Sequence, residues 1–348
     1  MEMLLYPRMS ASIIALALTA GIVAGTDGAS AKGCAAPPLP VTSLKLTRFY
    51  ADGAGTIIDR DLKKQHRQQV RPLVSFLRHV VKDADRSLPS GTATASKKRK
   101  AAASGHCALR WITAWARGGA MLGVMASKQA AYERNWDMTG LALAYLKLRR
   151  LASGQQRQII EPWLIKLAEC ARGFFDNPGR RRNNHWYWLG LGLGATALAT
   201  DSQRHWAMAR AIMGDAAKDI GADGTLAYEM ARKGRALHYH AFAAMALVTL
   251  AELAASRGQD WYGLQAGALH RLVALTVRGL QQPQLFRKLS GYRQSRPIKA
   301  GAGWLLLYAA RFPDRLAAPL PAMKYGHRWL GGDLRKLQKI LRARGPGN

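Results

Sequence analysis

The sequence predicts an all-α protein built from antiparallel helix hairpins around a common centre. From residue 107 onward, apolar residues recur at helical spacing in segments of helix length, separated by short polar breaks. Alternating strand patterns are nearly absent, and alanine, which favours helices, is abundant. No linker divides the chain. We therefore expect a signal peptide at 1–31, one helical domain at 32–335 and a basic C-terminal tail at 336–348.

The composition indicates a globular protein that binds a polyanion. The chain has 348 residues, 49% of them hydrophobic, which is enough for a substantial core. Its 52 Lys and Arg residues oppose only 21 Asp and Glu, giving a formal net charge of +31. Such a charge attracts nucleic acid, anionic lipid or acidic polysaccharide. Charge alone does not choose among them.

The N-terminus has the pattern of an export signal. Arg8 precedes an apolar run over residues 13–23, and Ala29-Ser30-Ala31 offers the small residues of a cleavage site. The run is short for a membrane span, so we expect cleavage after Ala31 and no stable membrane insertion, with an uncleaved anchor as the alternative. Lys32 argues against a lipoprotein signal at Gly33-Cys34. A periplasmic or secreted protein rarely meets nucleic acid, so we expect none as a partner.

The three cysteines suit an oxidising compartment, where disulfides persist. Cys170 lies in a helical pattern and is interpreted as a small buried hydrophobe. We therefore expect a disulfide between Cys34 and Cys107, which ties the mature N-terminus to the body. No CxxC pattern accompanies these cysteines, so we expect no metal site.

Four segments precede Cys107. Residues 37–40 form an extended lead-in, and the polar, glycine-containing stretch 50–61 is interpreted as a loop. Apolar residues at helical spacing predict a helix from 61 to 83. The stretch 87–105, which carries the basic run 97–100, is interpreted as a solvated flexible loop, and the alternative is an electrostatic funnel for a polyanionic substrate.

Helical patterns then follow one another to residue 311. We expect helices near 107–117, 122–151, 155–175, 184–200, 203–220, 236–257, 260–280 and 299–311.

Two clusters carry the candidate chemistry. Residues 183–188 read Asn-Asn-His-Trp-Tyr-Trp, which combines amides, an imidazole and aromatic faces that suit sugar rings. The second cluster spans 232–240 and contains Arg232 and Tyr239, which share a helix face if one helix includes both. Gly234 lies between them and argues against a single continuous helix. If Arg232 instead ends a loop, it still points over the same site.

These residue types suit β-elimination on a polyuronate. Removing the C5 proton places a second negative charge next to the C6 carboxylate, so the carboxylate must be neutralised by amide, imidazole or guanidinium donors. A base takes the C5 proton and an acid protonates the O4 leaving group. Asn184, His185 and Arg232 provide the donors. Tyr239 does either proton transfer when cationic neighbours lower its pKa.

The two clusters resemble a known family. The NNHWYW hexapeptide, the element Glu229-Met230-Ala231-Arg232 and the RALHYH run at 235–240 are similar to motifs of the mannuronate-specific, all-helical alginate lyases. Weaker similarity at 107–115, 141–148 and 330–333 extends the resemblance over most of the mature chain. The resemblance implies an incomplete (α/α) toroid, no cofactor, metal-free β-elimination and products with a 4,5-unsaturated uronate.

The resemblance also assigns catalytic roles. The charge-neutralising Asn and His correspond to Asn184 and His185, the Arg to Arg232, and the catalytic Tyr to Tyr239. In syn elimination from mannuronate, the Tyr acts as base and then as acid, and the His supports charge stabilisation or serves as base on the opposite epimer. Trp186 departs from the pattern, where a small residue is common, and is the first place to look for altered substrate choice.

Several further residues are candidates for binding sugar. We expect substrate contacts from Tyr187, Trp188, Trp136, His240 and Lys63; Lys63 follows a glycine-containing loop that can close over substrate. Each has a plain alternative as a packing or surface residue. Core packing is the favoured interpretation for Trp111 and Trp115, and at least one of His238 and His240 is expected to be structural.

The sequence therefore predicts an exported polysaccharide lyase, monomeric, that cleaves a polyuronate, with alginate or polymannuronate as the first candidate. Glucuronan or another polyuronate is the alternative substrate. A non-catalytic protein that binds acidic polysaccharide is the alternative function.

Overall fold

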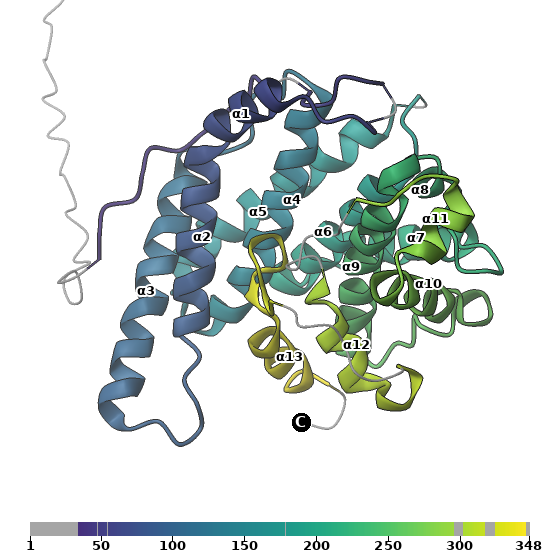
Figure 1. The fold of residues 1–348 in the computed structure, drawn as a ribbon. Helices are drawn as coiled ribbons and strands as arrows, with labels where there is room; N and C mark the ends of the chain where they lie inside the picture. The colour runs from purple at the N-terminus through teal and green to yellow at the C-terminus, as the bar shows by residue number, and fades with distance from the viewer. Residues whose placement is uncertain are drawn as a thin grey trace, which may run out of the picture. The chain divides into compact units, whose positions relative to one another are not determined.

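Helices make up nearly all of the regular structure (Figure 1). The computed structural model describes residues 34–46, 48–53, 55–177, 179–295, 302–316 and 324–345. The predicted signal peptide and its cleavage site lie outside these residues. The α-helices are α1 Arg60–Gln69, α2 Arg71–Arg86, α3 Ala95–Arg117, α4 Lys128–Leu148, α5 Gly154–Phe175, α6 Asn184–Thr200, α7 Gln203–Asp219, α8 Ala227–Met230, α9 Ala236–Ala255, α10 Leu264–Gln281, α11 Gln284–Ser290, α12 Leu305–Arg311 and α13 Leu334–Arg342.

Short elements complete the chain. The 3₁₀ helices are η1 Arg149–Leu151, η2 Lys233–Arg235, η4 Pro313–Arg315 and η5 Arg328–Leu330. Strands β1 Gly326–His327 and β2 Gly332–Asp333 pair antiparallel, with Gly326 opposite Asp333. This small hairpin leads directly into α13.

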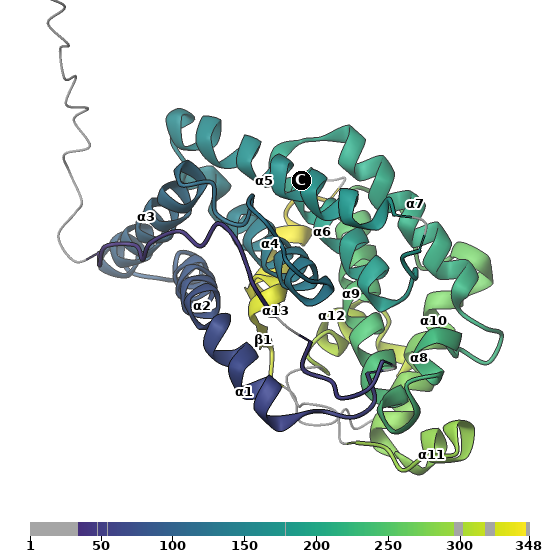
Figure 2. The ribbon, with the colours of Figure 1, turned by 90° about the horizontal axis from the view of Figure 1, so that it is seen from above.

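The helices form an incomplete (α/α) toroid, as predicted. Figure 2 shows α3, α5, α7 and α10 around the inner helices α4, α6 and α9. Helix α6 packs against α4, α7 and α9 and is buried along nearly its whole length. Its glycines permit this close approach: a Cβ at Gly192 would lie 2.5 Å from the Met138 Cε on α4, and one at Gly190 would lie 2.7 Å from Ile212 on α7. Residues 35–348 form one compact unit.

The predicted helix at 61–83 is two helices, α1 and α2, separated at Val70. Pro72 stands in the first turn of α2, where its missing N–H costs nothing, but the same residue prevents a continuous helix through this point. The break is what allows α1 to leave the direction of α2 (Figure 1).

The interpretation of 87–105 as a flexible loop is wrong from residue 95 onward. Thr94 caps α3 by accepting from the Lys97 backbone N–H at 3.4 Å, and the helix then continues for 23 residues. Alanine, lysine and arginine in this stretch are strong helix formers. The basic run 97–100 therefore lies on the first turns of a helix.

The C-terminal helix crosses position 335, where a basic tail was expected to begin. Leu337 and Leu341 of α13 are buried, so residues 336–342 pack on the body. The buried Lys147 of α4 fixes the preceding hairpin, because its Nζ donates to Asp85 Oδ1 at 2.6 Å and to the Gly331 carbonyl at 2.7 Å. The helical domain continues past the expected boundary.

The remaining predictions about the body concern cysteines and tryptophans. Cys34 and Cys107 are disulfide-bonded, as predicted, and Cys170 is a free thiol that is half-buried rather than buried. Trp111 and Trp115 are core residues whose indole N–H groups donate to the Ala35 and Pro38 carbonyls at 2.9 Å. Among the described residues, one helix, Lys233–Ala255, is long and apolar enough to cross a membrane, and most of it is buried inside the protein, as in the core of a globular fold.

Candidate active site

The site begins at the N-terminus of α6, where Asn184 is held by a carboxylate from α8. Asn183 caps the helix by accepting from the His185 N–H at 3.1 Å. The backbone N–H of Asn184 donates to Glu229 at 2.8 Å, and its side-chain amide donates to both Glu229 oxygens at 3.0 Å. Asn184 is 0% exposed and Glu229 is 1% exposed. This buried contact joins the first sequence cluster to α8, which directly precedes the second cluster.

The contact changes what Asn184 offers a ligand. The Asn184 Nδ2 nitrogen lies within hydrogen-bonding distance of both Glu229 oxygens, and its Oδ1 oxygen is buried without a partner. Sequence analysis expected an amide donor to the substrate at this position; in the free protein that amide nitrogen donates to Glu229. Burial raises the pKa of Glu229, while the Asn184 hydrogen bonds and the Arg232 charge act in the opposite direction.

His185 lies flat against an aromatic ring that the sequence analysis missed. Its imidazole stacks on Tyr132 of α4, with ring centroids 3.6 Å apart and planes within 3°. The Nδ1 atom is buried without a partner. Burial, followed by the Arg232 charge, lowers the pKa of His185 to about 3. The ring is therefore a neutral imidazole that can donate or accept one hydrogen bond at a ligand.

Arg232 and Tyr239 meet without sharing a helix. Lys233 has a positive φ of 54°, which is incompatible with a continuous helix from α8 to α9. Arg232 therefore lies in the turn that connects the two helices. The Arg232 guanidinium carbon lies 3.8 Å from the centre of the Tyr239 ring, and that of Arg235 lies 5.2 Å from it. Arg232 also donates to the Gly55 carbonyl at 3.2 Å. The turn thus places two cations over one phenol.

A second tyrosine, Tyr50, completes this cluster. Its hydroxyl lies 2.5 Å from the Tyr239 hydroxyl, although 189 positions separate the two residues. The loop that carries Tyr50 is held by Asp52, which accepts from the backbone N–H groups of Thr56 and Ile57 at 2.8 Å. The predicted loop at 50–61 therefore lies against the catalytic candidates.

The proton affinity of Tyr239 differs from expectation. Arg232 and Arg235 lower its pKa, as predicted from the sequence, but burial raises it and Tyr50 adds to that effect. The net change is upward because burial is the largest contribution. In the free protein Tyr239 is therefore a neutral phenol.

Three of the expected sugar-binding residues are committed elsewhere. The Tyr187 hydroxyl donates to Asp219 at 2.9 Å, and the Trp188 indole donates to the Phe242 carbonyl at 3.1 Å. His240 is 0% exposed and uses both ring nitrogens: Nδ1 bonds the Ala236 carbonyl, and Nε2 accepts from the Leu226 N–H, each at 2.9 Å. The hydrogen bonds of these three side chains stabilise the packing beneath the site.

Two other expected residues do lie with the cluster. Trp136 has its ring centre 5.6 Å from that of His185, and its indole nitrogen is buried without a partner. Burial lowers the pKa of Lys63 on α1, and the nearby charges of Arg67 and Arg235 lower it further. Burial, then Arg235, Arg232 and Lys63, lower the pKa of His238 to about 4, so His238 faces these cations.

Trp186 points away from the cluster. Its indole N–H donates to Asp215 of α7 at 3.2 Å, and the Arg182 guanidinium lies 4.7 Å from its ring centre. Phe175 packs on the same ring, with centroids 5.6 Å apart. The residue that departs from the family motif therefore has packing partners of its own on the outer side of α6.

The residues that the sequence analysis missed come mostly from other segments. Tyr132 and Tyr50 had no local signal, whereas Glu229 belongs to the Glu229-Met230-Ala231-Arg232 element of the family motif. Trp329 of η5 adds an aromatic ring 4.6 Å from Trp136. For Glu229, the motif was the usable signal: an acidic residue three positions before Arg232.

We refer to Asn184, His185, Arg232, Tyr239 and Tyr50 as the active-site cluster. It combines one guanidinium group, one amide, a neutral imidazole and two phenols, and the buried Glu229 carboxylate beside it accepts from Asn184. Such a set suits an anionic ligand and proton transfer. Within the described residues, no group of three or more His, Cys, Asp or Glu side chains is arranged to hold a metal ion.

Comparisons with known proteins agree on one family. The family described as alginate lyase matches residues 50–286. A polysaccharide lyase from Stenotrophomonas maltophilia is 40% identical over 302 residues, covering 86% of this chain and 87% of its own. An alginate lyase from Cobetia marina is 28% identical, covering 89% of this chain and 85% of its own.

Solved structures show the same fold. A variant of alginate lyase A1-III complexed with tetrasaccharide has a TM-score of 0.75 at 20% identity, covering 87% of this chain and 85% of that chain. The crystal structure of alginate lyase A1-III from Sphingomonas species A1 has a TM-score of 0.72 at 21% identity, covering 87% and 86%. At 20–21% sequence identity, this structural similarity shows a shared fold.

Proposed function

The chain belongs to the alginate lyase family and is a polysaccharide lyase, and from this premise we propose that it cleaves a polyuronate by β-elimination, with mannuronate-rich alginate as the preferred substrate. We further propose that it works as an exported monomer. The observation that carries the proposal is the Arg232 guanidinium 3.8 Å from the centre of the Tyr239 ring, beside the neutral His185. This proximity supports a carboxylate-binding role for Arg232 and a proton-transfer role for Tyr239.

The first task of the site is to neutralise the uronate carboxylate. The planar guanidinium of Arg232 matches a carboxylate, and the His185 imidazole adds one hydrogen bond. A carboxylate placed between them would raise the pKa of His185, because it offsets the Arg232 charge that now lowers it. Asn184, through its free Oδ1, accepts a hydrogen bond from a sugar hydroxyl or from a protonated carboxyl.

The second task is proton transfer, which we assign to Tyr239. Substrate binding first releases the phenolic proton of Tyr239 to solvent. The resulting phenolate takes the C5 proton, the C5–H electrons form the C4–C5 double bond, and the bond from C4 to O4 breaks with its electron pair remaining on O4. Tyr239, now a phenol, gives the same proton to O4, so the residue ends as it began. The charges of Arg232 and Arg235 stabilise the phenolate against the burial that raises its pKa.

Substrate access requires movement of the Tyr50 loop. Tyr239 is 6% exposed, and its hydroxyl is occupied by Tyr50 in the free protein. The Gly55 carbonyl of the same loop accepts from Arg232. We expect the loop to open for the polymer and then return Tyr50 to Tyr239 over the bound sugar.

A substrate panel tests the proposed reaction. Polymannuronate, glucuronan and polygalacturonate are incubated with the enzyme, and the ultraviolet absorbance of the unsaturated product is followed. We expect the fastest rise with polymannuronate. A faster rise with glucuronan would move the specificity to that polymer, and no rise with any uronan would refute the lyase reaction.

The catalytic assignment is tested with Tyr239→Phe. We expect kcat to fall on the order of 10²- to 10⁴-fold, because the ring and its packing remain while the transferable proton is lost. Polymer binding should persist. The matched control is Tyr187→Phe, another buried tyrosine that has its hydroxyl on Asp219, and it should keep turnover near that of the unmodified enzyme.

A further inference from the structure

A basic groove lies between the N-terminal turns of α3, the end of α2 and α13. Its volume is about 730 Å³, which is in the range of ligand-binding pockets, about 300–1,000 Å³. The groove is lined by one acidic side chain, Asp333, and by six cationic ones, which are Arg86, Lys97, Lys100, Arg335, Lys336 and Lys339. We call it the α3–α13 groove. None of its lining residues belongs to the active-site cluster.

Three of the six cationic side chains make contacts within the protein. Arg335 pairs with Asp333 at 2.6 Å, and Arg86 pairs with Asp83 at 3.1 Å. Lys336 donates to the carbonyls of Asp85 and Leu88 at the end of α2. These contacts hold the walls of the groove in place and leave the other cations to a ligand.

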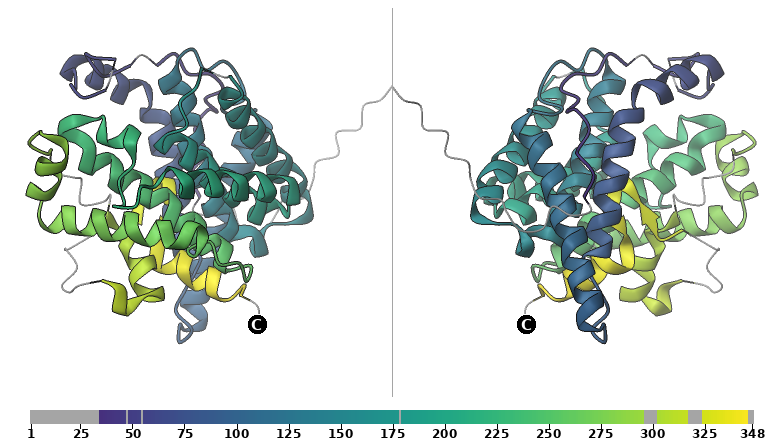
Figure 3. Two further views of the ribbon diagram at one scale, coloured as in Figure 1. Left: turned by 90° about the vertical axis from the view of Figure 1, so that its right-hand side faces the viewer. Right: turned by 90° about the vertical axis from the view of Figure 1, so that its left-hand side faces the viewer.

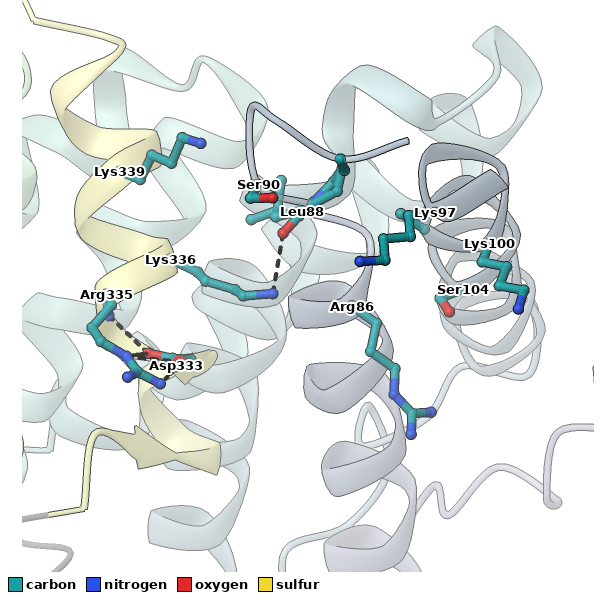
Figure 4. Close-up of a pocket in the computed structure, with 13 residues that line it drawn as sticks. Arg86, Leu88, Ser90, Lys97, Lys100, Ser104, Asp333, Arg335, Lys336 and Lys339 are labelled. Atoms are coloured by element: carbon teal, nitrogen blue, oxygen red, sulfur yellow. Dashed lines mark hydrogen bonds and ion pairs between the residues drawn. The ribbon is translucent and has the colours of Figure 1, made fainter. Parts of the chain in front are cut away.

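The other three cations, Lys97, Lys100 and Lys339, are exposed and have no carboxylate partner in the part of the chain that the structure describes. Figure 4 shows Lys97 on α3 and Lys339 on α13 at opposite sides of the groove, with the loop that carries Leu88 and Ser90 between them. Their positive charge is not balanced by the protein itself.

The position of the lysines on α3 is itself unfavourable for the helix. The N-terminal end of a helix carries a partial positive charge, so exposed cations in its first turn lower the stability of the helix. The first turn of α3 has no acidic residue, and Lys97 and Lys100 follow within six residues of its start. An anion in the groove would be attracted both by the lysines and by the helix.

The rest of the lining favours a sugar polymer over a small inorganic anion. Leu88, Pro89, Ala93 and Ala101 give the groove an apolar floor that suits the C–H faces of sugar rings. The free cations are ammonium groups, which pair with single carboxylates as point charges, rather than guanidinium forks. Spaced ammonium groups on two walls match carboxylates repeated along a chain.

From this arrangement we propose that the α3–α13 groove is a second, non-catalytic binding site for acidic polysaccharide. The proposal rests on the proposed polyuronate substrate. In Figures 1 and 3 the loop joining α2 to α3 lies at the lower edge of the body, whereas α1 lies at the upper edge. A polymer held at the groove stays near the enzyme between cleavage events, which raises its effective concentration at the active-site cluster.

The test compares two triple variants with the same change in charge. The groove variant is Lys97→Gln, Lys100→Gln and Lys339→Gln, which keeps good helix formers at all three positions. The matched control is Lys98→Gln, Lys166→Gln and Lys218→Gln, which replaces exposed lysines that do not line the groove. Both are made in the Tyr239→Phe background so that the polymer survives, and binding to polymannuronate is measured by affinity electrophoresis.

We expect the groove variant to bind polymannuronate on the order of tenfold more weakly than the control, since each exposed ion pair contributes a small, additive attraction. The difference should shrink as salt is added. Equal binding by the two variants would overturn the proposal. So would a groove variant that keeps polymer binding but loses binding to inorganic phosphate or to vesicles of anionic phospholipid, because the groove would then serve a different anion.

Turnover provides an independent measure in the native Tyr239 background. The ratio of kcat/KM on long polymer to kcat/KM on a trisaccharide should fall in the groove variant and not in the control. Binding is measured without catalysis, so a protein that cleaved no uronan would refute the proposed reaction and still report on the groove.

Discussion

The protein uses positive charge in two different ways, at the active-site cluster and in the α3–α13 groove. At the cluster, Arg232 lies 3.8 Å from the centre of the Tyr239 ring and is fixed by the Gly55 carbonyl. In the groove, Lys97 and Lys339 extend from exposed helix surfaces without a carboxylate partner among the described residues. Charge acts strongly where water is excluded and weakly where it is not.

The comparison separates catalysis from retention of the polymer. A half-buried, planar cation at a fixed distance, such as Arg232, can favour one protonation state of a neighbouring phenol and one charge state of a bound uronate. Exposed ammonium groups have no such control over geometry and contribute only attraction. The number of basic residues is therefore a poor guide to which of them take part in the reaction.

Among the variants that test this comparison of the two cation sites, the largest effect is expected for Arg232→Lys, which keeps the charge and removes the planar fork. We expect kcat/KM to fall on the order of 10²- to 10³-fold, because a lysine ammonium cannot both stack on Tyr239 and bind a carboxylate through two bonds. Steady-state kinetics on polymannuronate measure the loss. Arg182→Lys is the control, since Arg182 also lies over an aromatic ring but on the outer side of α6. Similar losses in both variants would erase the distinction between fixed and exposed cations.

A second, smaller effect is expected for the buried carboxylate that holds Asn184. Glu229→Gln has nearly the same shape but brings an amide N–H₂ against the donors of Asn184, so buried donors lose their acceptor. We expect the free energy of unfolding to fall by about 1–3 kcal/mol, measured by urea denaturation. Glu169→Gln, at a partly exposed ion pair, should cost about 1 kcal/mol or less. A larger loss at Glu169 would contradict the role of burial.

The third effect is a loss of stability in acid from histidines buried in the neutral form. Burial lowers the pKa of His240 to about 4, whereas an unfolded histidine titrates near 6.5. Below about 6.5 the unfolded chain therefore binds more protons than the folded one, and the free energy of unfolding falls as the pH falls towards 4. His185 and His238, with pKa values lowered to about 3 and about 4, act in the same direction.

The contribution of His240 is about 3 kcal/mol at most, from the size of its pKa shift. Urea denaturation between pH 7 and pH 4.5 measures it. His240→Gln should lower stability at pH 7, because two hydrogen bonds to the backbone are lost, and should show a shallower decline in acid. His106→Gln, at an exposed position, should keep the original slope. An unchanged slope in His240→Gln would place the acid sensitivity elsewhere.

Much of the fold could be predicted from the sequence, because helix formation depends on residues that are close along the chain. The 3.6-residue periodicity located the helices near α4 to α7, and α9, within a few residues of their observed ends. The same local reasoning missed the break at Val70 and the start of α3 at Ala95, where a proline and an N-cap carried the information.

The sequence alone determined the helical fold class, the Cys34–Cys107 disulfide and the family, since each depends on composition, count or a motif read along the chain. Only the tertiary structure decided the roles of the side chains in the motifs. Tyr50 reaches Tyr239 across 189 positions, and Glu229 takes the amide hydrogens of Asn184 across 45. A side chain acts through the atoms that face it, and those atoms come from segments that only the folded packing brings together.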